Sequence, residues 1–508
     1  MRVPPALGIA STLAIALFAA LGLVLPLGAL LTAASGWSGF LDSEALAVAR
    51  TTTFQAALST ALSAAIGLPL GIWVGSLGPG QRERVVAWLR VPYGVPTVVA
   101  GTAWVAWLGR EGWLAPLDLA YGFAAVVLAH VFFNAPWIAA LVAEARASVP
   151  ESLDDAARSL GASAWRRALH VHWPAVRASL AAASAQVFAL CSMSFALVLI
   201  LGGGPPVDTL ETALYAKVRF GSLDLAGAIA FALWELLITL VPWALVLALT
   251  QPARVEPPAH ARERRPAPRW ASAAALAVAL LFIVPYLSVF SSASLASDRL
   301  TGLWVPAWVS LRIALAAALG SVTLALAAIA SSAFLSPRSR WAAGAIALLM
   351  ALPAGISVLV LGMGLWLAYE RWIDPFAGSL AAICALQILI FAPLAYRALW
   401  PVARGARRRL LEAAATLGAG PMRAFVAVEW PRWRGPIAGT AALVAGASLG
   451  EVAAVSLFYS ESLVPLPLLV SRWMAQYRFD EARGLSAVLM VLSAGVMLFS
   501  ARVSHGRA

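Results

Sequence analysis

The chain has 508 residues, of which 61% are hydrophobic and only 12% are charged. This composition lies far outside the range of soluble globular domains, so the sequence predicts an integral membrane protein. The net charge of +12 would suggest a nucleic-acid partner in a soluble protein, but in a membrane protein the distribution of arginine over the loops decides its meaning.

Twelve apolar stretches are each long enough to cross a bilayer, which takes roughly 20 residues. The first stretch, residues 6–31, is too long for a typical signal-peptide core and is typical of a signal-anchor, although its cleavage stays open. The sequence therefore predicts an all-α protein with about twelve transmembrane helices. They begin near Leu7, Thr52, Val91, Leu119, Ser179, Asp224, Trp270, Ser310, Trp341, Ser379, Gly435 and Gly484.

The basic residues indicate the orientation of these helices. With the amino terminus inside, 26 of the 36 Lys and Arg residues, Arg397 among them, fall on the cytoplasmic side, and nine fall outside. Cytoplasmic loops carry the excess of positive charge in membrane proteins. We therefore expect a multi-pass membrane protein with both termini in the cytoplasm. The charge is then a topology signal, and no nucleic-acid partner is expected.

One polar segment occurs twice in the chain. Residues 154–174 and 411–431 agree at nine of 21 positions, at a constant offset of 257. The same offset places Pro96 on Pro353 and the Ala-Pro pair at Pro136 on the pair at Pro393. These matches indicate that a whole six-helix unit is duplicated.

Because six is an even number, both copies enter the membrane in the same direction, and the repeats are parallel. Residues 1–250 form the first repeat and residues 270–508 the second. Residues 251–269 are rich in Pro and Arg, cannot form a core, and are expected to be a cytoplasmic linker.

The repeated segment predicts a short amphipathic helix. In the first copy Ser152 and Asp155 have capping-box spacing, and Gly161 ends the helix. A second short stretch then leads to Pro174, where a bend is expected. The apolar stripe contains Leu153, Ala156, Ala157 and Leu160. Such a helix can rest on lipid headgroups or dock on a cytoplasmic partner. Its recurrence on the cytoplasmic side of both repeats favours docking.

The segment resembles the EAA loop of ABC importer permeases, whose type I fold contains two such parallel units. The resemblance implies a place in the bacterial inner membrane and coupling helices that sit in clefts of two copies of a cytoplasmic ATPase. It assigns this role to two sets of residues, although Asp replaces the usual Glu in the first copy. The sets are Asp155, Ala156, Ala157 and Gly161, and Glu412, Ala413, Ala414 and Gly418.

The chain is not expected to be an enzyme. A P-loop needs a Gly-Lys pair around the phosphates, whereas the only lysine, Lys217, follows Ala216. ATP and magnesium therefore belong on the ATPase partner, and no cofactor is expected on this chain. A secondary transporter would not need two matched docking helices, and an intramembrane metalloenzyme would need a motif such as HExxH, which does not occur.

Other stretches, such as "LGGGPPVDTLETALY" at residues 201–215 and "LFYSESLVPLPLLV" at residues 457–470, resemble the fused thiamine permeases of this family. The resemblance implies import of thiamine or its phosphates from a periplasmic binding protein. Fused ferric-iron permeases share the architecture and remain an alternative. The outward loops, residues 202–223 and 460–483, are long enough to receive one lobe each of that protein.

Two acidic residues inside the spans are candidates for the cargo pathway. Glu451 and Glu235 lie where a charge is costly and normally faces the protein interior. Glu451 is the stronger candidate for a cationic ligand, with tryptophan rings as further contacts. Each carboxyl can instead be protonated and bonded to a neighbouring helix. His130 and Asn134 share a helix face and are expected to form interhelical hydrogen bonds.

Overall fold

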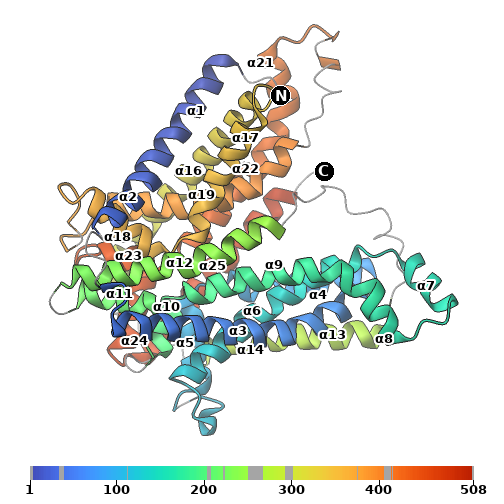
Figure 1. Cartoon of the computed structure of the whole chain (residues 1–508), viewed down its shortest axis with the longest axis horizontal. Coiled ribbons are helices and arrows are strands. Elements are labelled where there is room, and N and C mark those ends of the chain that lie inside the picture. The colour runs from blue at the N-terminus through green and yellow to red at the C-terminus, as the bar shows by residue number, and fades with distance from the viewer. Residues whose placement is uncertain are drawn as a thin grey trace.

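The structure, a computed structural model, describes residues 4–33, 39–110, 112–202, 207–220, 223–249, 267–291, 301–374, 376–404, 413–414 and 416–505. Every regular element in these residues is a helix (Figure 1). Helices suit a bilayer because they pair their own backbone polar groups where water is absent. The all-α fold class expected from the sequence is confirmed.

The described residues of the first half form twelve α-helices. They are α1 (Pro5–Ala19), α2 (Leu25–Ala33), α3 (Ser43–Gly75), α4 (Pro79–Leu89), α5 (Thr97–Leu108), α6 (Phe123–Ala147), α7 (Glu151–Ser159), α8 (Ala164–Arg167), α9 (Trp173–Ser192), α10 (Ala196–Leu201), α11 (Leu210–Arg219) and α12 (Leu225–Leu249).

The described part of the second half repeats this order. Its helices are α13 (Arg269–Leu281), α14 (Val284–Leu287), α16 (Trp304–Leu335), α17 (Arg340–Ala351), α18 (Val358–Ala368), α19 (Leu380–Arg404), α21 (Pro421–Ala424), α22 (Trp430–Ser448), α23 (Ala453–Phe458), α24 (Leu466–Ala475) and α25 (Phe479–His505).

Eight helices in the described residues are long and apolar enough to cross a membrane, or up to eleven if each bent pair counts as one span. These eleven correspond to all but one of the twelve expected spans. The twelfth, expected near Gly435, corresponds to α22, which begins with two arginines and two prolines in seven residues. This polar start explains why α22 is not among the helices that are long and apolar enough to cross a membrane.

Two of the expected straight spans are sharply broken. α4 and α5 meet at 95°, and α17 and α18 meet at 105°. Each break is a short 3-10 turn, Pro92–Gly94 or Leu352–Gly355, followed by an extended residue. Because Pro92 and Pro353 occupy the same place in the two breaks, the offset here is 261. The pairing of Pro96 with Pro353 is therefore wrong by four residues.

α3 and α6 pack through a row of glycines. Gly67, Gly71 and Gly75 are four residues apart on α3, and a Cβ atom on any of them would lie 2.6–2.8 Å from the nearest atom of α6. Small residues at this spacing let two backbones approach closely in a bilayer, where packing rather than water exclusion holds helices together. The glycines thus allow the closest helix pair of the first repeat to form.

The first helix of each repeat packs on the other repeat. On α1, Ile15 joins a core cluster formed by α16, α17, α19 and α22, and Thr12 is 2.8 Å from Ser331 of α16. On α13, Ala271 and Ala275 join a cluster formed by α3, α4 and α6. The two repeats therefore exchange their first helices, and neither is packed from its own segment alone.

The helices form two diverging arms (Figure 1). We call α3, α4, α6, α9 and α13 the first arm and α1, α16, α17, α19 and α22 the second arm, and contacts among these helices bind each arm together. The arms meet at an end formed by α5, α10, α11, α18, α23 and α24, here called the closed side. They separate at the opposite end, the open side, which carries α7 and α21.

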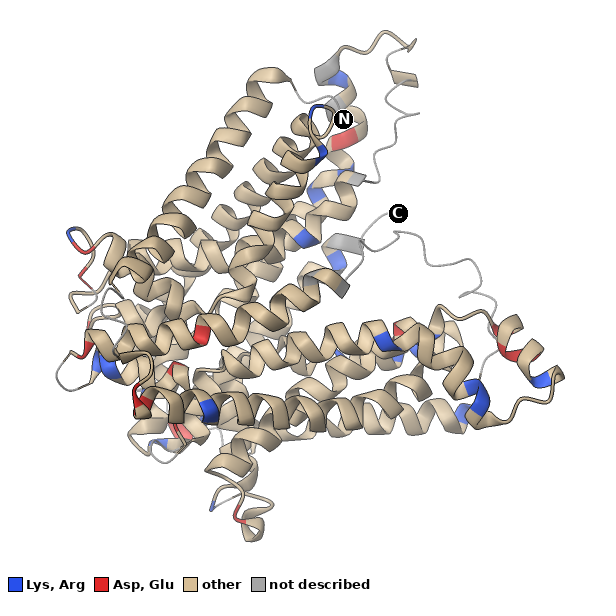
Figure 2. Cartoon of the chain, viewed as in Figure 1, with Lys and Arg blue, Asp and Glu red and all other residues tan. Residues whose placement is uncertain are grey.

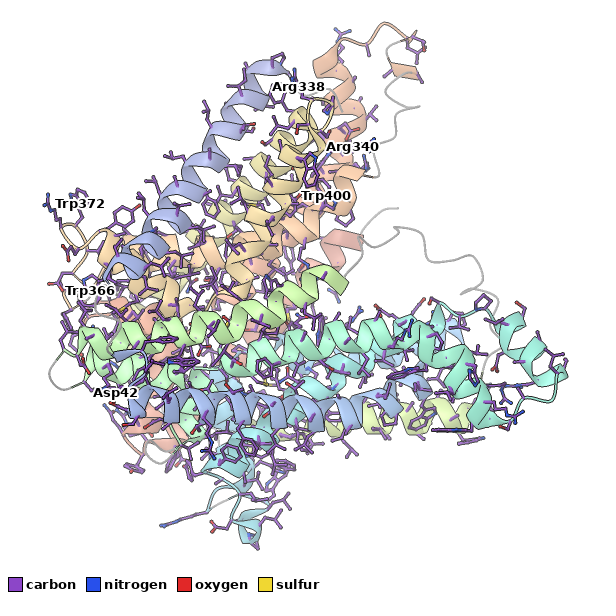
Figure 3. All side chains as sticks on the ribbon, in the orientation of Figure 1. Asp42, Arg338, Arg340, Trp366, Trp372 and Trp400 are labelled. Carbon is purple, nitrogen blue, oxygen red and sulfur yellow. The ribbon has the colours of Figure 1, made fainter. Side chains whose placement is uncertain are left out.

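Charged residues gather at the ends of the helices and in the loops, and the middle stretches of the arms carry few of them (Figure 2). Arg338 and Arg340 lie at the open end of the second arm, whereas Trp366 and Trp372 lie near its closed end (Figure 3). This distribution is typical of helices that cross a hydrocarbon layer between two polar zones.

Candidate functional site

The first repeated segment forms α7 at the tip of the first arm (Figure 1). The helix begins at Glu151 with Pro150 as its N-cap, and no side chain caps it, so the capping box expected at Ser152 is wrong. Glu151 and Asp154 in its first turn suit the positive end of the helix. Among the elements that the structure describes, this short helix protrudes at the tip of the arm (Figure 1).

The apolar stripe of α7 is exposed. Leu153 is 51% and Leu160 87% exposed, Asp155 and Ala156 are exposed, and Ala157 is half-buried. Large apolar side chains left open at a helix end are typical of a surface that a partner covers. The expected acid, the two alanines and the turn glycine thus lie together at one exposed tip.

The second copy repeats this geometry. The amides of Leu160 and Ala162 donate to the carbonyls of Ala156 and Ala157 at 3.1 and 3.0 Å. Their counterparts, Leu417 and Ala419, donate to Ala413 and Ala414 at 3.0 and 2.9 Å. Leu417 is also 87% exposed, Ala413 is exposed, and Ala414 is half-buried.

Gly161 and Gly418 both have a φ of +76°. This left-handed conformation closes the helix, because it turns the next amides back to the last free carbonyls. No atom lies within 4 Å of the position a Cβ would take on either glycine, so backbone conformation alone accounts for the residue type. Glu412 lies outside the described residues.

A π-helical turn connects each segment to the next long helix. The turns are Ala168–His172 and Phe425–Glu429, and Trp173-Pro174 and Trp430-Pro431 follow them. In the first copy the amide of Trp173 donates to Ala168. Proline has no amide to donate, and a π-turn leaves room for it in the helix. The bend expected at Pro174 is therefore wrong, and the segment continues directly into α9.

A cavity of about 470 Å³ lies between the two arms. Its volume is within the ordinary range for small-molecule sites. The first repeat contributes Tyr93, Phe133 and Trp243, and the second contributes Phe391 and Glu451. The wall therefore combines aromatic rings with the carboxylate of Glu451 and the guanidinium of Arg397. Rings and a carboxylate are groups that attract an organic cation.

Glu451 occupies the break between α22 and α23. Its carboxylate accepts hydrogen bonds from the amides of Ala453 at 2.7 Å and Ala454 at 3.3 Å. It thus caps the start of α23 while it lines the cavity. Arg397 also lines the cavity, and it lies within α19 and not in a loop. The sequence did not predict this position, because α19 continues as a helix to Arg404, beyond the end of its apolar stretch.

The second acidic candidate does not reach the cavity wall. Glu235 is 1% exposed within α12 and is not among the residues that line the cavity. Its nearest electrostatic partner is Glu211 of α11, which accepts a hydrogen bond from Ser357 of the other repeat. Glu235 is therefore buried beside a second acidic residue and away from the cavity wall, and sequence reasoning missed Glu211.

His130 and Asn134 have the interhelical role expected of them. The His130 ring is 2.6 Å from Gln55 and 2.9 Å from Ser194, through its two nitrogens. Asn134 donates to the His130 carbonyl at 2.9 Å and to the thiol of Cys191 at 3.5 Å. These bonds connect α3, α6 and the end of α9 beside the cavity.

The expected outward loops each contain a short helix on the closed side, α11 and α24. Both helices start in the same way, since Thr52 accepts from the amide of Leu210 and Ser310 from that of Leu466, at 2.9 and 2.8 Å. Arg219, at the end of α11, stacks 4.1 Å from the ring of Tyr459 in the second repeat. This contact fastens the two repeats together on the closed side.

Ion pairs order the same region. Lys217 is 2.9 Å from Asp224 and 3.0 Å from Glu44. The pKa of Asp224 is lowered by a hydrogen bond from the amide of Gly227 and by Lys217. Arg472 and Glu461 form a salt bridge at 2.9 Å, which lowers the pKa of Glu461.

Comparison with known proteins identifies the family. The family model described as "Binding-protein-dependent transport system inner membrane component" matches residues 67–302 and 323–505. The thiamine transport system permease protein ThiP of Brucella abortus is 30% identical, over 94% of this chain and 93% of its own length. The proteins of that name from Haemophilus influenzae and Escherichia coli are each 28% identical, over 86% and 78% of this chain and 85% and 78% of their own lengths. Since the family model matches most of the chain in two segments, this chain belongs to the family of inner membrane components of binding-protein-dependent transport systems.

Proposed function

We propose that this protein is the permease subunit of an ABC importer that carries thiamine or its phosphates across the inner membrane. The observation that carries the proposal is the pair of exposed segments with matching geometry at the tips of the two arms. The relatives named above, each a thiamine transport system permease protein by name, match 78–94% of this chain. The open side is then the cytoplasmic side, with both termini on it.

In this proposal two copies of an ATPase receive the exposed stripes of the two segments. Asp155 to Ala157 with Gly161, and Glu412 to Ala414 with Gly418, form the two coupling surfaces. ATP and magnesium are held by those subunits, and this chain contributes only movement. Drawing the two tips together closes the arms, which now diverge on the open side, and separates the contacts on the closed side.

The cavity is the proposed cargo site. A thiazolium cation would face the carboxylate of Glu451, and the rings of Tyr93, Phe133, Trp243 and Phe391 would cover its flat faces. Because Glu451 also caps α23, Glu451→Gln keeps most of the cap and removes the charge. We expect this variant to lower thiamine uptake more than it lowers the amount of folded protein.

The binding protein is proposed to dock on the closed side, with one lobe on each of the loops that hold α11 and α24. Crosslinkers at Asp208 and Glu461 test this arrangement, because the two residues flank different short helices. We expect each position to label a different lobe. Labelling of a single lobe from both positions would contradict the arrangement.

Uptake into liposomes tests the function itself. The chain is reconstituted with its ATPase and binding protein, and thiamine is offered first, then ferric iron. We expect thiamine uptake that requires ATP and the binding protein. Uptake of ferric iron but not of thiamine would indicate an iron importer instead, and thiamine uptake without ATP would indicate a secondary transporter.

A further inference from the structure

One buried carboxylate, that of Asp154, connects the first coupling segment to the arm behind it. Asp154 is only 7% exposed, although its neighbours on α7 are open to solvent. Its Oδ2 atom is 2.9 Å from Arg158. Its Oδ1 atom is 3.2 Å from Arg167 of α8 and 3.2 Å from His172 of the π-turn. The carboxylate therefore spans three successive elements.

The same cluster reaches the preceding helix. The Nε2 atom of His172 is 3.3 Å from the guanidinium of Arg146, a residue of α6 that is 7% exposed. Arg167 also donates to the carbonyl of Ala162 in the turn after α7, at 2.9 Å. Ion pairs that are shielded from water hold their geometry better than exposed pairs do. The cluster thus connects α6, α7, α8 and the start of α9.

None of the residues of this cluster recurs at the aligned position of the second repeat. At the offset of 257, the positions of Asp154, Arg167, His172 and Arg146 are occupied by Leu411, Ala424, Glu429 and Ala403. Glu429 is buried but accepts from Arg432 at 3.4 Å and from Trp433 at 3.1 Å, both on α22. These contacts strengthen the base of α22 and involve no residue of its coupling segment.

We infer that Asp154 is a positioning residue that makes the first coupling helix and α9 move as one body, and that the second coupling helix lacks this fastening. The inference rests on the proposed function. Two copies of one ATPase would then bind one coupling helix that is firmly attached to its arm and one that is less firmly attached. Nucleotide-driven movement passes to the transmembrane helices mainly through the first arm.

Spin-label mobility in the full-length chain tests the inference without any transport assay. Leu160 and Leu417 are both 87% exposed, so labels at Leu160→Cys and Leu417→Cys differ in attachment and not in burial. We expect the label at position 160 to be the less mobile of the two, and Asp154→Asn to raise its mobility to that at position 417. Equal mobilities, or no response to Asp154→Asn, would overturn the inference.

Coupled transport provides the second measurement. We expect Asp154→Asn to lower the cargo transported per ATP hydrolysed at least about fivefold, the lower end of usual coupling factors between sites, with the ATPase still bound. Arg167→Gln should act in the same direction. Arg166→Gln is the matched control, because Arg166 is exposed and has no ion pair among the described residues.

The outcomes separate this inference from the proposed function. An intact complex with an unchanged transport ratio in Asp154→Asn, or an equal loss in Arg166→Gln, would overturn the positioning role. If Asp154→Asn fails to fold, Arg167→Gln alone decides, since it leaves two partners on the carboxylate. A wild-type chain without ATP-driven uptake would instead refute the proposed function, and the mobility measurement would still test the positioning role of Asp154.

Discussion

Replacing the turn glycines changes the backbone conformation of the coupling segments and leaves their exposed side chains unchanged. Gly161 and Gly418 have the same φ of +76° and no neighbour within 4 Å of an added Cβ. Gly→Ala at either position therefore introduces no clash, and its cost is the left-handed backbone of an L-residue, about 1–2 kcal/mol. A cost of this size disfavours the native helix end by roughly 5–30-fold.

The assay is ATP-driven uptake into liposomes, with membrane expression measured in parallel. We expect Gly418→Ala to lower uptake clearly while expression stays near wild type. Gly418→Asn is the matched control, because asparagine tolerates the left-handed conformation and should retain most of the uptake. Equal uptake by the alanine variant and the wild type, or equal loss in both variants, would refute the conformational reasoning.

Two further predictions concern the closed side and the breaks. A Cβ on Gly355 would lie 2.1 Å from the ring of Trp243, whereas one on Gly94 would meet only the flexible end of a methionine. Gly355→Ala should therefore lower the thermal stability of the purified protein more than Gly94→Ala, and the reverse order would contradict this packing. The pKa of Asp224 is lowered by folding, so its contribution to stability is present above the ordinary value of 3.8 and is lost as the pH falls through the lowered value. Asp224→Asn should thus lower the thermal midpoint at pH 7, and this difference from the wild type should shrink as the pH falls below 3.8. A difference that does not change with pH would refute the ion-pair role.

The helical fold and the coupling tips could be predicted because they depend on local patterns. Apolar length predicts spans, and the small residues before Gly161 and Gly418 indicate a helix that ends in a left-handed turn. The same reasoning failed at the break after Pro92 and at the π-turn before Pro174. In both places the chain shifts its hydrogen-bond pattern around a proline, and composition alone does not say whether it breaks or continues.

The cavity was only partly predictable, because it is formed between segments far apart in the sequence. Glu451 was identified by its position in an apolar run. Tyr93 reaches the cavity only because the chain breaks between α4 and α5, and Arg397 only because α19 extends to Arg404. Asp154 was missed as a fastening residue, because its partners Arg167 and His172 come together only after the π-turn forms.

Photocrosslinking from the two tips tests the central claim most directly. A photoreactive residue is placed at Leu160 or at Leu417 in the full-length chain, which is then assembled with its ATPase and binding protein in membranes. The account predicts that both positions crosslink to the ATPase subunit, and that neither crosslinks to the binding protein. A crosslink from either tip to the binding protein would contradict the account, and so would the absence of any crosslink from the two tips to the ATPase.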